Sequence, residues 1–428
     1  MKACKIYIGG NIYGAGNIGD DAVLQGILRL VNSSLPEAVI NVGTHNGRRL
    51  AGLLPSVHTI NSDDMRQVIK TIKESHLFIS GGGTMISDEL NLSFPLGYNA
   101  RLISIAKFYG KRVSMLAIGA NRLHHDTGMK MGRTMVRLCD LITVRDDESR
   151  SVCLELGAKP SRTVTTVDPS FLLEAQETPR TKRLKERLRT RGKVFGVNVV
   201  NEVWAHLNGY KIGIARACEY ISSQYGYLPV FFCNEVRPGE FFDFQANSQT
   251  AVLLRCEHEV LEPVYYRPEE MIDILSAFEF VIGMRMHSLI FAAVAGTPFV
   301  AVSRVDKVDN LMHLFGLRPS GSVTHCESRK LIADAAHLIE KRQSVKRHLA
   351  KRVPGLRGQC LKNAPLLRDL VDGERRYFPK VNPSSLAFVL RLYLSGNKFY
   401  KRLRRFVSQD TGFSQVARRL LASRKVRL

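Results

Sequence analysis

The chain has 428 residues, 45% hydrophobic and 24% charged, so it is too long for one compact core and too apolar for global disorder. Its formal net charge of +23 favours acidic partners such as phosphorylated substrates, nucleic acid or anionic lipid surfaces. Its eight cysteines stand singly, which argues against a disulfide framework or zinc knuckle, and no uninterrupted run of about 20 apolar residues predicts a membrane span.

The first part of the chain alternates short β-rich runs with helical patterns. Strands are expected at 5–9, 39–42, 77–80, 112–118, 141–144 and 164–167. Helices are expected at 20–32, 63–75, 97–109, 130–139 and 148–156. Strands separated by helices of this length predict βαβ units and a parallel sheet.

A polar, Lys/Arg-rich stretch at 174–191 interrupts this pattern, and a second alternation follows it. Its strands are expected at 194–200, 228–233, 280–283 and 299–303, and its helices at 210–225, 268–277, 286–295 and 306–315. We therefore predict an α/β protein with two doubly wound Rossmann-like domains that face each other across a cleft. The expected boundaries are 1–175 for the first domain, 176–192 for an exposed linker, 193–350 for the second domain and 351–428 for a basic, amphipathic helical extension.

Two glycine-rich segments directly follow predicted strands. The first, residues 9–21, leads into a helix and offers Gly16, Asn17 and Gly19 as ligand-facing backbone, because a helix N-terminus presents unpaired N–H groups to an anion. It is neither a Walker A loop nor a dinucleotide fingerprint. Its carboxylates, Asp20 and Asp21, either serve the ligand or cap the helix.

The second glycine-rich segment contains three consecutive glycines, Gly81, Gly82 and Gly83. Consecutive glycines carry an entropic cost on folding, and a simple turn seldom needs all three. A backbone that lies against a ligand would explain them, and a tight structural turn is the alternative.

Single charged residues also stand at the carboxyl ends of predicted strands. Arg145 follows the strand at 141–144 and is a candidate ligand for an anion, whereas the acids after it fit the start of a helix. Asp168 follows the strand at 164–167 and is either a catalytic acid or base, or a cap.

The segment 281–288, Val-Ile-Gly-Met-Arg-Met-His-Ser, is the most informative. It places Arg285, His287 and Ser288 where a strand passes into a helix. Arginine offers two parallel donors to a carboxylate or phosphate, and histidine transfers protons near neutral pH. A core histidine and a surface ion pair are the alternative. Lys307 adds a cation at the next strand end, and no side chains stand at metal-ligand spacing, so no metal is expected.

These segments, in this order, resemble the polysaccharide pyruvyltransferase family. The matching stretches are 14–22, 80–83, 143–149, 166–170, 283–287, 296–298 and 306–308, within a resemblance that runs from about residue 5 to 320. The resemblance implies a two-domain architecture similar to the glycosyltransferase type called GT-B. It also implies a transferase that moves the pyruvyl group of phosphoenolpyruvate onto two hydroxyls of a sugar, forming a ketal and releasing phosphate.

If the resemblance carries over, Arg285 and His287 match the phosphoenolpyruvate-binding and catalytic positions. We then expect His287 to donate the proton and Arg285 to hold phosphate or carboxylate, while Asp20, Asp21 or Asp168 accepts a hydroxyl proton. Phosphoenolpyruvate is a co-substrate, so no cofactor is expected. The partners implied are phosphoenolpyruvate and a saccharide acceptor of polysaccharide biosynthesis, such as a lipid-linked oligosaccharide or an exopolysaccharide precursor.

One departure from the family and two rival functions remain. Family members often carry an arginine after the first strand of the second domain, where this chain has none, so an anion contact is either missing or replaced by Asn198 or Asn201. A GT-B-type glycosyltransferase using a nucleotide-sugar would need a ribose-reading carboxylate, for which Glu202 and Glu235 are the candidates. The other rival is a non-catalytic protein that binds a membrane surface or nucleic acid on a lapsed enzyme scaffold.

The C-terminal segment 371–428 carries 14 Lys/Arg and 3 Asp/Glu. Amphipathic helices are expected at 386–393, 399–407 and 413–427, and their aromatic residues stand among the cations. This pattern favours an anionic membrane surface over nucleic acid, with simple solvation of the charges as the alternative. Because no signal peptide is recognised, we expect a cytoplasmic protein, peripheral on the inner face of the membrane.

Overall fold

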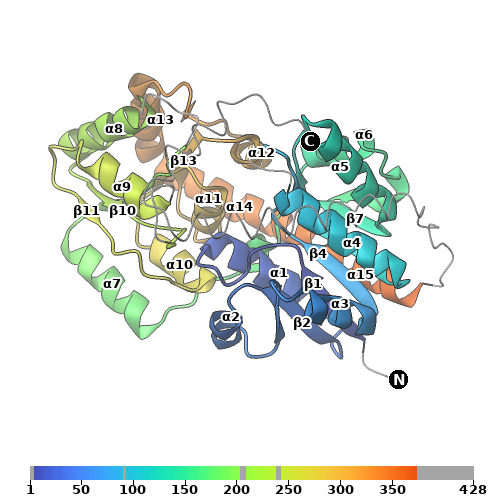
Figure 1. Ribbon diagram of the computed structural model, residues 1–428. Coiled ribbons are helices and arrows are strands. Elements are labelled where there is room, and N and C mark those ends of the chain that lie inside the picture. Colours follow the sequence, from blue (N-terminus) through green and yellow to red (C-terminus); the bar gives the residue numbers. More distant parts are fainter. Residues whose placement is uncertain (1–3, 90–92, 203–208, 238–241, 374–428) are drawn as a thin grey trace, which may run out of the picture.

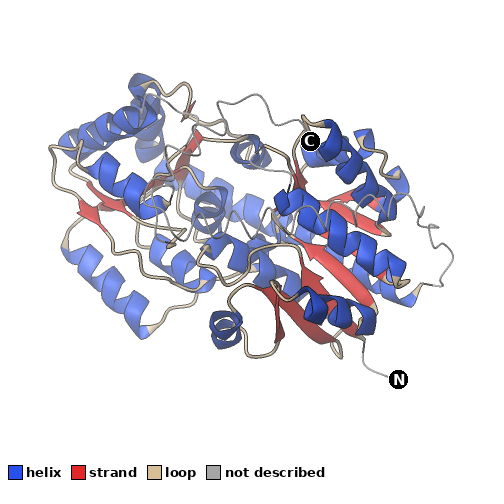
Figure 2. Cartoon of the chain, viewed as in Figure 1, coloured by secondary structure: helices blue, strands red, loops and turns tan. Residues whose placement is uncertain are grey.

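The computed structural model describes residues 4–89, 93–202, 209–237 and 242–373. Within them the chain forms two α/β domains, each with a parallel sheet covered by helices on both faces (Figures 1 and 2). The predicted α/β class with two doubly wound domains is confirmed. All eight cysteines are free thiols.

The sheet of the N-terminal domain has the strand order β3-β2-β1-β4-β6-β7-β8, with β5 paired to β6, and every pairing is parallel. Its strands are β1 (Lys5–Gly9), β2 (Val39–Thr44), β3 (His58–Asn61), β4 (Leu77–Gly81), β5 (Thr84–Ile86), β6 (Arg112–Ala120), β7 (Leu141–Val144) and β8 (Thr163–Thr165). Its helices are α1 (Ile18–Ser34), α2 (Gly47–Leu53), α3 (Met65–Glu74), α4 (Tyr98–Phe108), α5 (Asp126–Leu138), α6 (Asp147–Glu155) and the short helices η1 (Ser93–Gly97), η2 (Pro160–Arg162) and η3 (Pro169–Leu172).

The sheet of the C-terminal domain has the order β11-β10-β9-β12-β13-β14 and is likewise parallel. Its strands are β9 (Val194–Asn198), β10 (Leu228–Phe231), β11 (Glu259–Val260), β12 (Val281–Gly283), β13 (Phe299–Ser303) and β14 (Gly321–Ser322). Its helices are α8 (Gly209–Tyr225), α9 (Asp243–Ala251), α10 (Pro268–Leu275), α11 (Met286–Val294), α12 (Asp306–Leu314) and α13 (Ser328–Glu340).

The central strands are nearly continuous apolar runs because both of their faces are buried. In β1, Ile6 and Ile8 belong to one hydrophobic cluster, while Tyr7 between them belongs to another on the opposite face. This alternation follows from the two-residue period of a strand. It explains why these strands could be read from the sequence without a polar face to mark them.

Each sheet has a topological switch point, the place where the strand order reverses direction. In the N-terminal sheet it lies between β1 and β4, and in the C-terminal sheet between β9 and β12. Ligands of open parallel sheets bind beyond the carboxyl ends of the strands at such points. Both glycine-rich loops therefore begin at the switch point of the N-terminal sheet, and the Arg285–His287 segment begins at the switch point of the C-terminal sheet.

The expected linker at 176–192 contains a well-formed helix, α7 (Pro179–Thr190). Thr178 and Thr181 cap each other at its start, and the helix packs on α10. The amine of Lys185 is buried against Asp273, with an Nζ–Oδ1 distance of 2.5 Å. Most of the segment is exposed, and Arg180, Lys185 and Arg187 pair with the carboxylates of Glu270, Asp273 and Glu259 in the second domain.

The expected boundary at 350/351 falls inside α14 (Arg342–Leu361), which runs on to α15 (Asn363–Asp372). Helix α15 does not stay with the second domain; it packs against α1, β6 and β7 of the first (Figure 1). A single hydrophobic cluster joins the domains through residues of α1, η3, α11, α14 and α15.

The amphipathic helices expected after residue 386 lie outside the described residues. In the described part of the chain, no helix combines the length and the apolar character that crossing a bilayer requires.

Candidate active site

Backbone hydrogen bonds join the two domains where the loop after β1 meets the loop after β10. The amide of Ile18 donates to the carbonyl of Asn234 at 2.9 Å, and the amide of Val236 donates to the carbonyl of Gly16 at 3.0 Å. Asn17 and Glu235 form the antiparallel bridge between them. The first glycine-rich segment thus lies directly against the second domain at the edge of the cleft.

His287 is the second residue of α11 and faces the N-terminal domain. Its Nε2 lies 3.6 Å from Oδ2 of Asp168, and its side chain is 15% exposed. Its ring also lies against Gly19, where an added Cβ would come within 2.1 Å of Nδ1. Position 19 therefore requires glycine, because any side chain there would overlap the ring of His287.

Asp168 forms the cap that its sequence position suggested as one alternative, and its second oxygen faces His287. Its Oδ1 caps η3 by accepting from the amide of Ser170 at 3.0 Å and from its hydroxyl at 2.6 Å. Its Oδ2 faces His287 and has no other hydrogen-bond partner in the described residues. Burial alone would raise the pKa of Asp168, but His287, Arg145 and Ser170 outweigh it and lower the pKa to about 2. Asp168 thus places a lasting negative charge beside the imidazole.

The carboxylates Asp20 and Asp21 at the start of α1 have different surroundings. Asp21 is buried and accepts from the amide of Gly14 at 2.6 Å and from the hydroxyl of Tyr265 at 2.7 Å. Burial raises its pKa to about 6, although both donors oppose this. Burial also raises the pKa of Asp20, partly offset by His287, and its carboxylate accepts a hydrogen bond from the side chain of Asn11 at 3.3 Å. Asp20 is the carboxylate that remains accessible beside the histidine.

Arg285 precedes α11 and is anchored from behind. Its Nε and one terminal nitrogen both lie 2.6 Å from Oδ1 of Asp243. Burial alone would lower the pKa of Arg285, but Asp243 and Glu235 raise it, so the guanidinium stays charged. Ser288 supports the same region by donating to Oδ1 of Asn198 at 2.9 Å.

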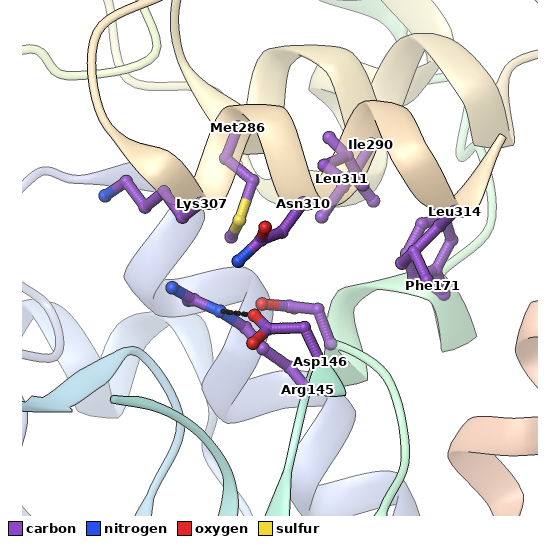
Figure 3. Close-up of a pocket in the computed structure, with 10 residues that line it drawn as sticks. Arg145, Asp146, Phe171, Met286, Ile290, Lys307, Asn310, Leu311 and Leu314 are labelled. Carbon is purple, nitrogen blue, oxygen red and sulfur yellow. Dashed lines mark ion pairs between the residues drawn. The ribbon is translucent and has the colours of Figure 1, made fainter. Parts of the chain in front are cut away.

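Arg145 and Lys307 approach each other from the two domains (Figure 3). Arg145 donates to the hydroxyl of Thr84 at 3.1 Å and lies 3.5 Å from Asp146, while its Nε has no hydrogen bond within the described chain. Figure 3 shows Lys307 at the start of α12, above Arg145 and Asp146. The hollow they share with Asp168 and Asn310 is narrow, with a cavity volume of about 10 Å³, which is room for about one water molecule.

Lys307 is half-buried, and among the described residues no carboxylate lies within ion-pair distance of it. Burial lowers its pKa to about 7, and the positive charges of Arg304, Arg145 and Arg285 add to this effect, against the opposing charge of Asp20. A cation surrounded mainly by cations favours the binding of an anion at this place.

The glycine triplet is explained by packing as well as by conformation. Gly82 and Gly83 have positive φ angles of 60° and 73°. A Cβ on Gly82 would lie 1.8 Å from Val23, and one on Gly81 would lie 2.7 Å from Ile27, both on α1. The close approach of α1 to β4 therefore requires these residues, with or without a ligand.

Several site residues had no signal in the sequence. They are Asp243, Arg237 and Arg304. Arg237 contacts Glu235 through two nitrogens, and Arg304 contacts Glu202 in the same way. The candidate replacement Asn198 is already engaged, because its amide donates to Asp243 at 2.9 Å. In the parts of the chain that are described, no three His, Cys, Asp or Glu side chains gather as a metal site would require.

Cations, an imidazole and helix N-termini at two switch points are suited to bind a phosphorylated ligand. The family model of polysaccharide pyruvyl transferase matches residues 17–306, which include Arg145, Asp168, Arg285 and His287 and end one residue before Lys307. The chain belongs to this family, and it is an enzyme of that class.

Solved structures confirm the GT-B-like arrangement of the two domains. HepE from Anabaena in complex with UDP-glucose is similar with a TM-score of 0.59 and 14% identity, over 86% of this chain and 100% of that one. UDP-GlcNAc 2-epimerase from Neisseria meningitidis bound to UDP-GlcNAc gives 0.56 and 12%, over 85% and 98%. UDP-GlcNAc 2-epimerase from Methanocaldococcus jannaschii gives 0.55 and 9%, over 78% and 92%. A search of curated proteins by sequence gave no match.

Proposed function

We propose that this transferase moves the pyruvyl group of phosphoenolpyruvate onto two hydroxyls of a saccharide, forming a cyclic ketal and releasing phosphate. The observation that carries the proposal is the group of cations around an imidazole at the cleft. Arg145, Arg285 and Lys307 come from three different loops, and Lys307 has no carboxylate partner in the described chain. A donor with about three negative charges needs several fixed cations to bind out of water.

The groups of the cleft suit each step of this reaction. Arg285, with Lys307 or Arg145, holds the phosphate and carboxylate of the donor. His287, held by Asp168, donates a proton to the methylene carbon and so leaves an oxocarbenium-like centre on the neighbouring carbon. One sugar hydroxyl adds to that centre, the C–O bond to phosphate breaks, and the second hydroxyl closes the ketal. Asp20 accepts the proton of one sugar hydroxyl, and the departing phosphate takes the proton of the other hydroxyl.

The nucleotide-sugar alternative finds less support among the described residues. Both carboxylates considered for reading a ribose are already engaged by arginines, Glu202 by Arg304 and Glu235 by Arg237. The likeness to the two proteins solved with UDP-sugars is at 12% and 14% identity and concerns the fold.

The decisive assay incubates the purified protein with phosphoenolpyruvate or with UDP-sugars, each with a panel of glycans. We expect glycan-dependent release of phosphate with phosphoenolpyruvate and a new ketal methyl signal in the proton NMR spectrum of the glycan. Release of UDP from a UDP-sugar, without phosphate release, would instead favour the glycosyltransferase. No turnover of any donor, with binding to anionic vesicles retained, would favour the non-catalytic alternative.

We further propose that the basic segment after α15 holds the enzyme at an anionic membrane surface, where a lipid-linked acceptor is found. The described chain ends at Gly373, whose carbonyl accepts a hydrogen bond from Arg112. A deletion should therefore begin at residue 374. We expect it to abolish binding to phosphatidylglycerol vesicles while leaving phosphate release with a soluble acceptor unchanged. Equal vesicle binding with and without the segment would reject this part of the proposal, and phosphatidylcholine vesicles are the control.

A further inference from the structure

Asp243 is a fully buried carboxylate that touches both the cleft and the contact between the domains. It is the first residue of α9 and has 0% exposure. We propose that Asp243 is a positioning residue that aims Arg285 at the donor and ties its placement to the backbone bridge between the two domains. This inference rests on the proposed function, because it takes Arg285 as a donor-binding group.

One oxygen of Asp243 is devoted to Arg285. Nε and one terminal nitrogen of the guanidinium lie 2.6 Å from Oδ1, a charge-assisted contact away from solvent. Because two nitrogens are fixed, the plane and direction of the guanidinium are fixed as well. The other terminal nitrogen has no partner among the described residues, so it is left for a ligand in the cleft.

The second oxygen holds the loop after β10. Oδ2 accepts from the amide of Asn234 at 2.8 Å, from the amide of Glu235 at 3.1 Å and from the side chain of Asn198 at 2.9 Å. The same loop forms the backbone bridge to Gly16 and Ile18 of the first domain. The carboxylate of Asp243 therefore supports both the contact between the domains and the orientation of Arg285.

The side-chain amide of Asn234 supports the view that this loop belongs to a ligand site. Its side chain is fully buried, and neither its oxygen nor its nitrogen has a hydrogen-bond partner in the described chain. A buried amide without partners is costly, which is accepted most often at functional sites. It lies in the loop that Asp243 holds, beside the domain contact.

The test compares Asp243→Asn with Asp243→Ala. The asparagine retains an oxygen that can accept from the loop amides, but it loses the charge that holds Arg285. We expect Asp243→Asn to raise the KM for phosphoenolpyruvate about ten- to a hundredfold with a smaller change in kcat, because a displaced guanidinium mainly weakens donor binding. Asp126→Asn, at the corresponding exposed first position of α5, is the matched control and should change neither constant.

A double-mutant cycle separates positioning from general structural damage. In the Arg285→Ala background, Asp243→Asn should add little to the increase in KM, since the residue it positions is gone. Full additivity of the two effects would overturn the proposal. Circular dichroism melting shows whether each variant is folded, and Arg285→Lys provides a second background if Arg285→Ala does not fold.

A ligand-free readout keeps this test separate from the proposed function. The Nε–H NMR signal of Arg285, assigned by its loss in Arg285→Lys, should be protected from water exchange in the wild type and exposed in Asp243→Asn. Unchanged protection in Asp243→Asn would overturn the positioning role. If the wild type releases no phosphate from phosphoenolpyruvate but the NMR signal behaves as expected, the proposed donor is wrong and the positioning of Arg285 stands.

Discussion

On the side of the N-terminal domain, the groups at the cleft include the carboxylates Asp20 and Asp168, whereas the C-terminal domain presents Arg285, His287 and Lys307. On that second side Asp243 lies behind Arg285, whereas Lys307 has no carboxylate within ion-pair distance in the described chain. Arg145 is the exception on the first side, because it is a cation. Its positive charge is one of those that lower the pKa of Lys307.

The difference suggests a division of labour. Backed by carboxylates, cations can be held in place without a ligand and still attract a polyanion, so the C-terminal domain is suited to the donor. Asp20 has no ion-pair partner in the described chain and a raised pKa, so it can accept a proton, and the N-terminal domain is suited to activating the acceptor hydroxyls. His287 stands where the two sides meet.

The largest expected effect is at this meeting point. His287→Ala should lower kcat about a hundred- to ten-thousandfold, the usual contribution of a general acid. The steady-state rate of phosphate release measures this. The variant should stay folded with a moderately lower melting temperature, because the buried carboxylate of Asp168 loses the neighbour that most lowers its pKa. His325→Ala, whose side chain is 80% exposed, is the control and should behave as the wild type. A near-normal rate for His287→Ala would remove the histidine from the mechanism.

Next in size is a change on the opposite face. Gly19→Ala would place a methyl group 2.1 Å from Nδ1 of His287 and so displace the ring. We expect the rate of phosphate release to fall about ten- to a hundredfold, since a shift of about 1 Å in a catalytic group has such effects. Gly52→Ala, where nothing lies within 4 Å of the added Cβ, should have no effect. Equal rates for both variants would show that His287 does not need its present position.

The pH dependence of donor binding should sharpen the contrast between the two faces. Because the pKa of Lys307 is lowered to about 7, its charge is present below pH 7 and lost above it. Donor affinity in the wild type should therefore fall as pH rises from 7, by up to about tenfold per pH unit. In Lys307→Arg the charge persists, so the ratio of wild-type to variant Kd should rise over this range. A ratio independent of pH from 6 to 8.5 would contradict the assignment.

The smallest effect concerns stability. The lowered pKa of Asp168, about 2 against an ordinary value of 3.8, stabilises the fold above pH 4, and this contribution is lost as pH falls from 4 towards 2. Asp168→Asn should lower the free energy of unfolding by about 2 kcal/mol at pH 7. Urea unfolding should show the difference shrinking as pH falls below 4. A difference that is constant between pH 7 and pH 2.5 would show that the charge of Asp168 is not the cause.

The fold could be predicted where apolar runs stand out. The strands at 141–144 and 299–303 have the predicted bounds, because buried parallel strands are short and almost entirely apolar. Helix α9 was not predicted, because it buries small or polar residues such as Ala246, Asn247 and Thr250 and so lacks an apolar stripe. Helix α2 buries Leu50 alone and gives no periodic signal either.

The candidate site could be predicted only where a residue directly follows a strand. Arg285 and His287 were found because the carboxyl ends of parallel strands gather at one edge, whatever their distance in sequence. The carboxylate behind Arg285 could not be found, since Asp243 stands 42 residues away and the fold alone brings the two together. The glycine triplet shows the opposite problem, because packing against α1 produces the same sequence pattern as a ligand.

The return of α15 to the N-terminal domain has a consequence for how the protein is made. Leu367 and Ala364 share the hydrophobic cluster of α1, and Arg368 donates to the carbonyls of Ser33 and Ser34. Helix α15 follows the whole second domain in sequence. During synthesis on the ribosome, the first domain therefore lacks this covering helix until the second domain has been translated. Nascent chains and fragments that stop near residue 175 leave this apolar surface of α1 uncovered, which makes them targets for chaperones and prone to aggregate.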